Sequence, residues 1–230
     1  MKIAGLQSLS LVDYPGCLAA AVFTQGCNFH CGYCHNPGLI SPEGSGGCSE
    51  EDVFSEISAR KNTIEGVTVT GGEPTIQKGL PDFADKIKDM GFKFKLDTNG
   101  SNPAAIESML KAELIDYIAV DIKTSFPKYN LVTGIKGIAR SLEESIFLTM
   151  LSTARYEFRI TCVPGLVEET DIELIGGTLK GAEKIVLQQF RPYRTYDRKF
   201  QSIEPYGKET LKNFQKIMEN YARHVDLRGF

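Results

Sequence analysis

Residues 18–38 read LAAAVFTQGCNFHCGYCHNPG, an uncharged apolar run that leads directly into a polar segment with three cysteines. The run at 18–25 has the length and composition of a buried β-strand. Cys27, Cys31 and Cys34 follow it within eight residues, in the spacing Cys-x3-Cys-x2-Cys. The stretch therefore predicts a buried strand whose carboxyl end carries a group of thiols.

The same arrangement recurs along the chain. Five further apolar runs predict strands, at residues 66–72, 92–100, 115–123, 156–165 and 183–190. Between and after these runs, helical patterns cover residues 49–62, 80–91, 103–113, 141–153, about 170–180 and 208–224. Strands that alternate with helices predict a parallel sheet covered by helices.

The position of the polar residues selects among parallel sheets. They follow all six expected strands, as TQGC, TGGEP, DTNG, DIK, VPG and QQFRPY. A (β/α) barrel gathers its active-site residues at many strand ends, whereas a doubly wound sheet gathers them at one switch point. A complete barrel takes about 250 residues, and this chain of 230 residues has six expected units. We therefore expect an α/β fold, an incomplete, open (β/α)6 TIM-like barrel, as a single domain over residues 1–230.

Charge and hydropathy exclude some functions. The formal net charge is -3, whereas a protein that grips nucleic acid usually presents a basic face. No apolar run approaches the ~20 residues that cross a bilayer, and Asp13 interrupts the N-terminal segment before a signal-peptide core could form. We expect a cytoplasmic protein with no nucleic-acid or membrane partner.

The chain has six cysteines, and in a reducing cytoplasm they are expected as metal ligands or buried thiols. Cys17, Cys48 and Cys162 are scattered, which favours small core side chains. The three clustered thiols suit zinc or an iron–sulfur cluster. A structural zinc site or an electron-transfer cluster would need a fourth protein ligand. The cluster therefore predicts a site with one coordination position left for another molecule.

The cysteine cluster, with Tyr33 before its last cysteine, resembles the signature of the radical S-adenosylmethionine (SAM) enzymes. TGGEP at 70–74 matches the Gly-Gly-Glu motif of the same superfamily. The resemblance implies that Cys27, Cys31 and Cys34 hold one 4Fe–4S cluster and that SAM occupies the open iron. It also implies that SAM is cleaved reductively, and that the resulting 5′-deoxyadenosyl radical removes a hydrogen atom.

Longer motifs narrow the resemblance. SLVDYPGCLAAAVFTQGCNFHCGYCHNP, DTNG, DIK and RITCVPG are similar to segments of glycyl-radical enzyme activating enzymes, over a span from Leu9 to the terminal VDLRG. The most similar group activates anaerobic ribonucleoside-triphosphate reductase, and pyruvate formate-lyase activase is related to it. This resemblance implies an oxidoreductase that removes hydrogen from a glycine of a partner protein, with a flavodoxin- or ferredoxin-type electron donor.

Three alternatives remain open from the sequence. The partner could be a pyruvate formate-lyase-like enzyme. The substrate could be a small molecule, as in 7-carboxy-7-deazaguanine synthase. The chain could also be a zinc or iron–sulfur binding module without catalytic activity.

The resemblance further implies a set of residues that contact SAM: Tyr33, Gly71, Gly72, Glu73, Asp97, Thr98, Asp121, Lys123, Arg159 and Gln189. Tyr33 is expected near the adenine, and the Gly-Gly-Glu residues near the methionine amino group. Asp97, Thr98 and Asp121 are expected around the methionine carboxylate and a monovalent cation, Na+ or K+. The expected catalytic residues are Asp13, near the entrance for the glycine loop, together with Lys123 and Arg159.

The charges support this grouping independently. Two acidic and two basic residues fall at predicted strand ends: Asp97, Asp121, Lys123 and Arg159. A zwitterionic ligand needs such a mixture, and desolvated charges are tolerated only when they are paired. Salt bridges at the rim of the barrel are the simpler explanation for the same four residues.

Near the last expected strand the chain departs from pyruvate formate-lyase activase. That family has a histidine after its Pro-Tyr pair, where this chain has Arg194. Gln189 or Arg194 is therefore expected to contact the ribose. Arg191, Arg194 and Arg198 form either a solvated basic edge or a docking patch for an acidic partner or electron donor.

Overall fold

The computed structural model describes residues 1–44 and 47–229. Within those ranges, eight strands form one sheet in the order β1 to β8. The strands are β1 (Ile3–Ser10), β2 (Ala19–Thr24), β3 (Gly66–Gly71), β4 (Lys93–Thr98), β5 (Tyr117–Asp121), β6 (Arg155–Cys162), β7 (Ala182–Gln189) and β8 (Ala222–Arg228). β1 is antiparallel to β2, and every later neighbour pair is parallel.

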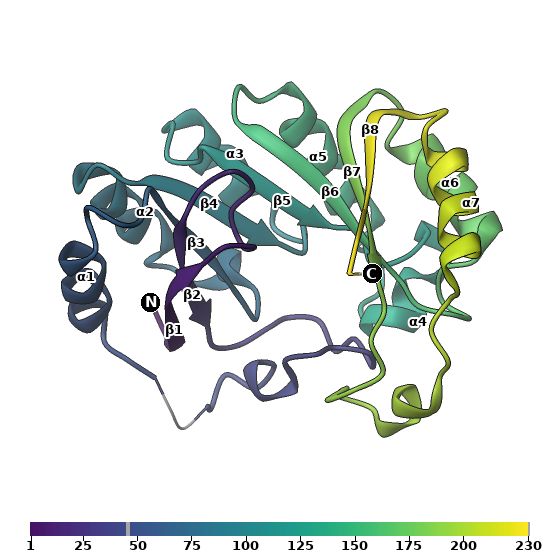
Figure 1. The fold of residues 1–230 in the computed structure, drawn as a ribbon, viewed down its shortest axis with the longest axis horizontal. Coiled ribbons are helices and arrows are strands. Elements are labelled where there is room, and N and C mark those ends of the chain that lie inside the picture. The colour runs from purple at the N-terminus through teal and green to yellow at the C-terminus, as the bar shows by residue number, and fades with distance from the viewer. Residues whose placement is uncertain (45–46, 230) are drawn as a thin grey trace.

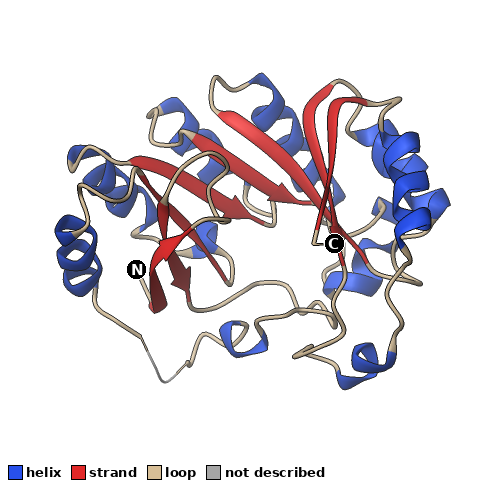
Figure 2. Cartoon of the chain, in the orientation of Figure 1, coloured by secondary structure: helices blue, strands red, loops and turns tan. Residues whose placement is uncertain are grey.

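The sheet curves into an open barrel with helices on its outer side (Figures 1 and 2). The α-helices are α1 (Glu50–Ala59), α2 (Leu80–Asp89), α3 (Pro103–Lys111), α4 (Tyr129–Thr133), α5 (Ala139–Leu151), α6 (Glu169–Thr178) and α7 (Lys208–Met218). Short 3-10 helices are η1 (Pro37–Leu39), η2 (Pro74–Ile76), η3 (Phe126–Lys128) and η4 (Arg198–Ser202). None of the described helices is both long and apolar enough to cross a membrane.

The six strands expected from the sequence are confirmed as β2 to β7, and the fold is the expected open α/β barrel. Two edge strands were not expected, because β1 and β8 lack the continuous apolar run of a buried strand. The expected helix at 208–224 was too long. Its buried residues Leu211, Phe214 and Met218 keep helical spacing, but from Ala222 the chain pairs with β7 instead.

Side chains alternate between the two faces of the sheet, as the strand period requires. On β4, Phe94 and Leu96 belong to the apolar core, whereas Lys95 and Asp97 are buried polar residues on the other face. β6 repeats the pattern, with Phe158 in the core and polar neighbours on either side. The apolar core therefore lies between the strands and the helices, and the interior of the barrel is polar.

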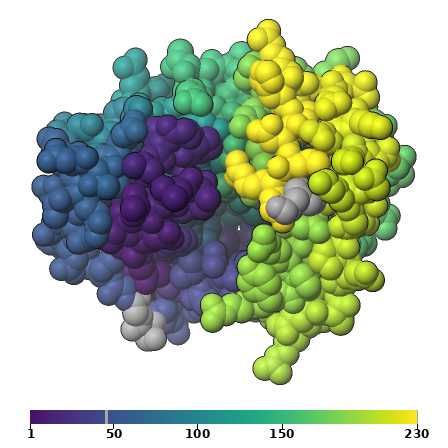
Figure 3. Space-filling model, viewed as in Figure 1, coloured from purple at the N-terminus to yellow at the C-terminus, as the bar shows by residue number. Residues whose placement is uncertain are grey.

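The barrel is open between β1 and β8, which are the two edges of the sheet order. Figure 3 shows a hollow between the purple N-terminal strands and the yellow and green C-terminal part of the chain. Because β2 to β8 are parallel, their carboxyl ends lie at one end of the barrel. The polar segments that follow these strands are therefore brought together.

Candidate functional site

A cavity of about 320 Å³ lies at the carboxyl ends of the strands. The structure places every residue of the predicted site on its wall except Gln189: Asp13, Cys27, Cys31, Tyr33, Cys34, Gly71, Gly72, Glu73, Asp97, Thr98, Asp121, Lys123 and Arg159. These residues come from segments spread over more than half of the chain. One cavity therefore combines thiols, glycines and charges of both signs.

The cysteines lie on residues 25–40, which we call the cluster loop. Its two ends are tied together, because the backbone N–H of Gly26 donates to the carbonyl of Leu39 at 2.8 Å and that of Cys27 donates to Ile40 at 3.0 Å. The middle is fixed to α4 by a hydrogen bond from the N–H of His30 to the carbonyl of Thr133, at 3.0 Å. The three thiols are thus presented on an anchored loop.

All six cysteines are free. Within residues 1–44 and 47–229, no group of three or more His, Cys, Asp or Glu side chains converges on a point where one metal ion could be held. Three thiolates on one wall are the protein ligands that an iron–sulfur cluster or a zinc ion would use. Burial raises the pKa of Cys31 to about 12 and also raises the pKa of Cys27. These thiols therefore release protons when they bind metal.

Gly71 and Gly72 allow the end of β3 to lie against the cluster loop. A Cβ on Gly72 would lie 2.0 Å from the carbonyl oxygen of Gly26, and one on Gly71 would lie 2.4 Å from the backbone nitrogen of Thr24. Gly71 also has a φ of +110°, a conformation that side chains other than that of glycine rarely adopt. Both positions therefore require glycine for close backbone packing.

Glu73 is fully buried, and its carboxylate is already surrounded by donors. One oxygen accepts from the backbone N–H of Thr75 at 3.1 Å, from its hydroxyl at 2.5 Å and from the hydroxyl of Thr98 at 2.6 Å. The other oxygen accepts from the N–H of Asn99 at 2.7 Å. Burial raises the pKa of Glu73 although these donors oppose the rise. The carboxylate thus ties the loop after β3 to the loop after β4.

The charged residues form one alternating series that we call the charge chain: Lys95, Asp97, Arg159, Asp121 and Lys123. Arg159 donates through Nη1 to Asp97 at 2.9 Å and through Nε to Asp121 at 2.7 Å. Lys123 binds Asp121 at 3.0 Å, and Lys95 binds Asp97 from the opposite side. Burial alone would raise the pKa of both aspartates, but the neighbouring cations outweigh it and hold each pKa below its ordinary value.

Tyr33 offers an unpaired polar atom on the cavity wall. Its side chain is buried, with the ring edge-on to Phe200 at 6.2 Å between centroids. Its hydroxyl is buried, and among the described residues it has no hydrogen-bond partner. A buried polar group without a partner is costly.

The two residues expected to contact the ribose, Gln189 and Arg194, do not line this cavity. Gln189 is not on the cavity wall; its amide donates to the carbonyl of Tyr206 at 2.9 Å. Its neighbour Gln188 lines the cavity beside Thr161, with which it is paired across β6 and β7. Arg194 lines a neighbouring hollow instead. Gln188 and Thr161 are the polar wall residues that the sequence reading missed on these strands.

Asp13 lies at the exposed edge of the cavity. Its carboxylate accepts from the hydroxyl of Ser10 at 2.5 Å. The residues just before it are apolar and open to solvent, with Leu11 73% and Val12 75% exposed. A carboxylate on the cavity wall is therefore preceded in the chain by two exposed apolar side chains, Leu11 and Val12, which we call the apolar lip.

Residues 190–200, which we call the capping segment, pack directly on the cluster loop. The backbone N–H of Tyr196 donates to the carbonyl of Cys34 at 3.1 Å, and that of Asp197 donates to Gly32 at 2.8 Å. The ring of His35 is stacked between Phe190 and Tyr193, both 5.9 Å away between centroids. This segment shields the cysteines from one side.

The three scattered cysteines lie away from the cavity wall. Cys162 belongs to the main core, and Cys17 packs with Tyr14 and Tyr117. Cys48 is half-buried against the core. They are packing residues, as expected.

Comparison with known proteins identifies the family to which the chain belongs. The sequence profile of the radical SAM superfamily matches residues 21–176. A protein of Methanocaldococcus jannaschii, whose name provisionally assigns it as a glycyl-radical enzyme activating enzyme, is 34% identical over 98% of this chain and 95% of its own length. The pyruvate formate-lyase-activating enzyme of Clostridium pasteurianum is 28% identical over 95% of this chain and 97% of its own length.

Solved structures support the fold. QueE from Escherichia coli superposes with a TM-score of 0.53 at 17% identity, over all of this chain and 92% of QueE. SuiB from Streptococcus suis, solved with S-adenosylmethionine bound, gives a TM-score of 0.65 at 15% identity, over 89% of this chain and 48% of SuiB. The chain therefore belongs to the radical SAM superfamily, among the glycyl-radical enzyme activating enzymes, whose cofactors are a 4Fe–4S cluster and SAM.

Proposed function

We propose that this chain removes a hydrogen atom from a glycine of anaerobic ribonucleoside-triphosphate reductase. The observation that carries the proposal is that one cavity is lined both by the three thiols and by four members of the charge chain, Asp97, Arg159, Asp121 and Lys123. The choice of reductase rests on the sequence motifs from Leu9 to the C-terminal VDLRG. A pyruvate formate-lyase-like partner is the second candidate, because the relatives at 25–28% identity carry that name.

Different residues of the cavity would bind the cluster and the methionine part of SAM. Cys27, Cys31 and Cys34 would hold the cluster, which supplies the electron that cleaves SAM so that its deoxyadenosyl group can accept the hydrogen atom. Arg159 and Lys123 would neutralise the methionine carboxylate, since both line the cavity and the charge chain has three cations for the two carboxylates of Asp97 and Asp121.

Two further residues would complete the site. Tyr33 lines the cavity and would pack near the adenine, as the resemblance implies. Glu73 holds the two loops in place rather than offering a free carboxylate. The protein thus orients the reactants and excludes water, while the cofactor carries the difficult chemistry.

A protein substrate suits the entrance. Leu11 and Val12 are largely exposed, and they directly precede Asp13, which lines the cavity. An apolar lip next to a carboxylate can receive a peptide loop through side-chain burial and a hydrogen bond to a backbone N–H. A glycine at the tip of that loop has no side chain, so its Cα can approach closely.

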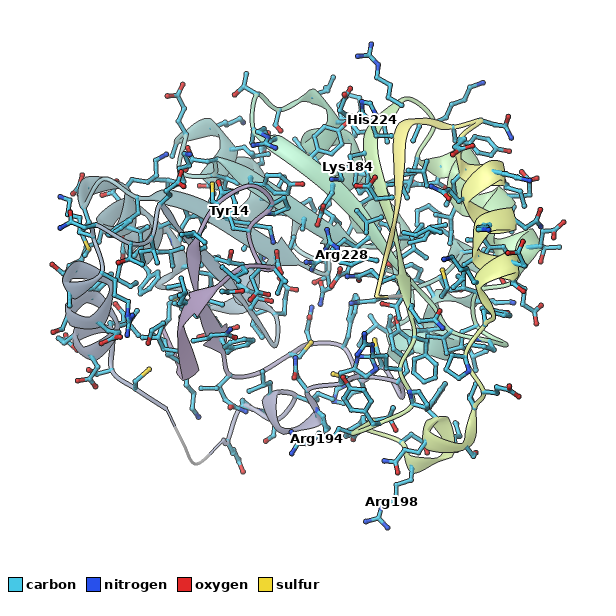
Figure 4. The ribbon with its side chains drawn as sticks, viewed as in Figure 1. Tyr14, Lys184, Arg194, Arg198, His224 and Arg228 are labelled. Carbon is cyan, nitrogen blue, oxygen red and sulfur yellow. The ribbon has the colours of Figure 1, made fainter. Side chains whose placement is uncertain are left out.

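The electron donor would be an acidic flavodoxin- or ferredoxin-type protein. The capping segment exposes Arg191, Arg194, Arg198 and Lys199, and it contacts the backbone of Gly32 and Cys34. Figure 4 shows Arg198 pointing away from the body of the molecule, where a partner can reach it. Because this basic surface rests on the cluster loop, a donor bound there would be close to the cluster.

The chain would work in the cytoplasm as one domain. All six cysteines are free, as expected in a reducing compartment. A single sheet joins β1 to β8, and the cavity draws residues from most of its strands.

The test uses anaerobically reconstituted protein, reduced and mixed with SAM and either of the two candidate partners. We expect 5′-deoxyadenosine together with a glycyl-radical doublet by electron paramagnetic resonance on the ribonucleotide reductase. A doublet on pyruvate formate-lyase alone would select the second candidate. Cleavage of SAM with neither doublet would favour a small-molecule substrate, and zinc without iron–sulfur absorption would favour a binding module.

A further inference from the structure

Lys95 is a buried cation that the predicted site does not include. It is 1% exposed, on the inner face of β4, two residues before Asp97. Its ammonium group binds Oδ1 of Asp97 and lies 5.7 Å from the centre of the Tyr117 ring. A lysine is rarely buried to this degree unless its charge is needed by a partner.

The oxygens that were expected to surround a monovalent cation are already engaged. Asp97 has Lys95 on Oδ1 and Arg159 on Oδ2, the latter at 2.9 Å. Asp121 has Arg159 on Oδ1 at 2.7 Å and Lys123 on Oδ2 at 3.0 Å. The hydroxyl of Thr98 donates to Glu73 at 2.6 Å. The expected Na+ or K+ ligands do not fit a metal ion, since each carboxylate oxygen faces a cationic side chain.

The charge balance agrees with this geometry. The charge chain has three cations and two anions, so it carries one net positive charge. One ligand carboxylate would neutralise it, whereas an added metal ion would double the excess. Uncompensated charge in a desolvated site is strongly unfavourable.

We propose that Lys95 replaces the monovalent cation, so that SAM binding by this chain depends on neither Na+ nor K+. Lys95 acts as a positioning residue. It neutralises Asp97 through Oδ1, and Oδ2 of Asp97 then holds the Arg159 guanidinium at the cavity. The inference rests on SAM being the ligand of this cavity, as in the proposed function.

The test measures SAM affinity by calorimetry on the anaerobically reconstituted protein with its cluster oxidised, so that no cleavage occurs. Choline chloride, NaCl and KCl are compared at equal ionic strength. We expect the wild-type affinity to agree within about twofold in the three salts. Lys95→Met should bind about tenfold or more weakly in choline, because a buried carboxylate oxygen loses its partner, and should recover at least partly in NaCl or KCl.

Lys93→Met is the matched control. Lys93 lies on the same strand, but its side chain is exposed and pairs with Glu65 at 3.3 Å. It should match the wild type in every salt. Cluster absorbance and melting temperature check that both variants are folded.

Two results would overturn the proposal. One is a wild-type affinity that rises more than about fivefold when Na+ or K+ replaces choline, a comparison that needs no variant. The other is a folded Lys95→Met protein whose affinity equals that of the wild type in choline. If the wild type bound SAM in none of the salts, the proposed function would fail, and this inference with it.

Discussion

The guanidinium of Arg159 on β6 donates through Nε to Oδ1 of Asp121 on β5, at 2.7 Å. Its Nη1 simultaneously reaches Asp97 on β4, at 2.9 Å. Arg159 therefore joins three neighbouring strands on the cavity wall. Only a planar group with several donors can do this, and lysine cannot.

Arg159→Lys should consequently lower SAM affinity although it keeps the positive charge. We expect about a tenfold loss or more, since one of the two aspartates is left without a partner. Calorimetry on the reconstituted protein measures the change. Arg223→Lys, at a residue whose side chain is 76% exposed, should bind SAM as tightly as the wild type. Equal affinity for both variants would remove Arg159 from the SAM site.

Gly72→Ala should disrupt the cluster loop. The new methyl group would lie 2.0 Å from the carbonyl oxygen of Gly26, and a backbone atom cannot rotate out of the way. We expect a loss of roughly 1–3 kcal/mol in the free energy of unfolding and less iron bound per protein after reconstitution. Gly38→Ala is the control, because no atom lies within 4 Å of its added Cβ. Normal iron content in Gly72→Ala would contradict the close packing described here.

Reversing charge on the capping segment should slow electron delivery. In Arg198→Glu/Lys199→Glu, we expect an acidic flavodoxin to reduce the cluster about tenfold more slowly at low salt, with a smaller difference at high salt. Stopped-flow absorbance follows the reduction. Dithionite should reduce wild type and variant equally fast, because it needs no docking.

The matched control places the same charge change elsewhere. Lys180→Glu/Arg223→Glu alters two exposed cations next to the amino ends of β7 and β8, far from the cluster loop. It should be reduced by flavodoxin at the wild-type rate. Equal slowing in both double variants would indicate a general charge effect and not a docking surface.

Asp171 should stabilise the fold in a pH-dependent way. Its buried carboxylate accepts from Lys128 and Ser125, both at 2.6 Å, and from the N–H of Glu168 at 2.9 Å. Burial alone would raise the pKa of Asp171, but these donors outweigh it and lower the pKa. A group with a lowered pKa contributes stability above its unfolded pKa and loses that contribution as the pH falls through the folded value.

Asp171→Asn should therefore unfold at lower urea concentration at pH 7, with a loss of about 1–3 kcal/mol. The difference from wild type should stay constant down to about pH 5 and narrow below about pH 4. Asp85→Asn, at an exposed position on α2, should show neither effect. A difference that grew on acidification would have the wrong sign for a lowered pKa.

The sequence predicted the middle of the barrel well because one physical rule covers it. In a parallel sheet every strand ends at the same side, so Cys27, Gly72, Asp97, Asp121 and Arg159 had to meet once their strands were recognised. The structure places all of them on one cavity wall.

What the sequence reading missed depends on which way a residue faces. Gln188 and Gln189 are adjacent, and successive side chains of a strand point to opposite faces. Ile185 and Leu187 belong to the apolar core, so Gln189 shares their face and Gln188 lines the cavity. Lys95 lies two residues before Asp97 and therefore on the same face of the strand, so the sequence alone could have placed both side chains inside the barrel. The burial of Lys95 could not be predicted from the sequence, because lysine side chains are usually exposed.

The two edge strands were not predicted from the sequence, for a different reason. β1 and β8 are only partly buried, so their hydrophobic pattern is weak, and both are recognisable only from pairing with a neighbour. The predicted helix at 208–224 extends the helical spacing past Met218, whereas pairing with β7 places the residues from Ala222 onward in a strand.

Deuterium transfer from a glycine tests the central claim most directly. The partner ribonucleotide reductase is prepared with glycine deuterated at Cα and incubated anaerobically with the reduced, reconstituted protein and SAM. Mass spectrometry of the product should show 5′-deoxyadenosine carrying one deuterium, in step with the appearance of the glycyl radical. Unlabelled 5′-deoxyadenosine formed at the same yield would show that the hydrogen comes from elsewhere, and it would contradict a glycine as the target.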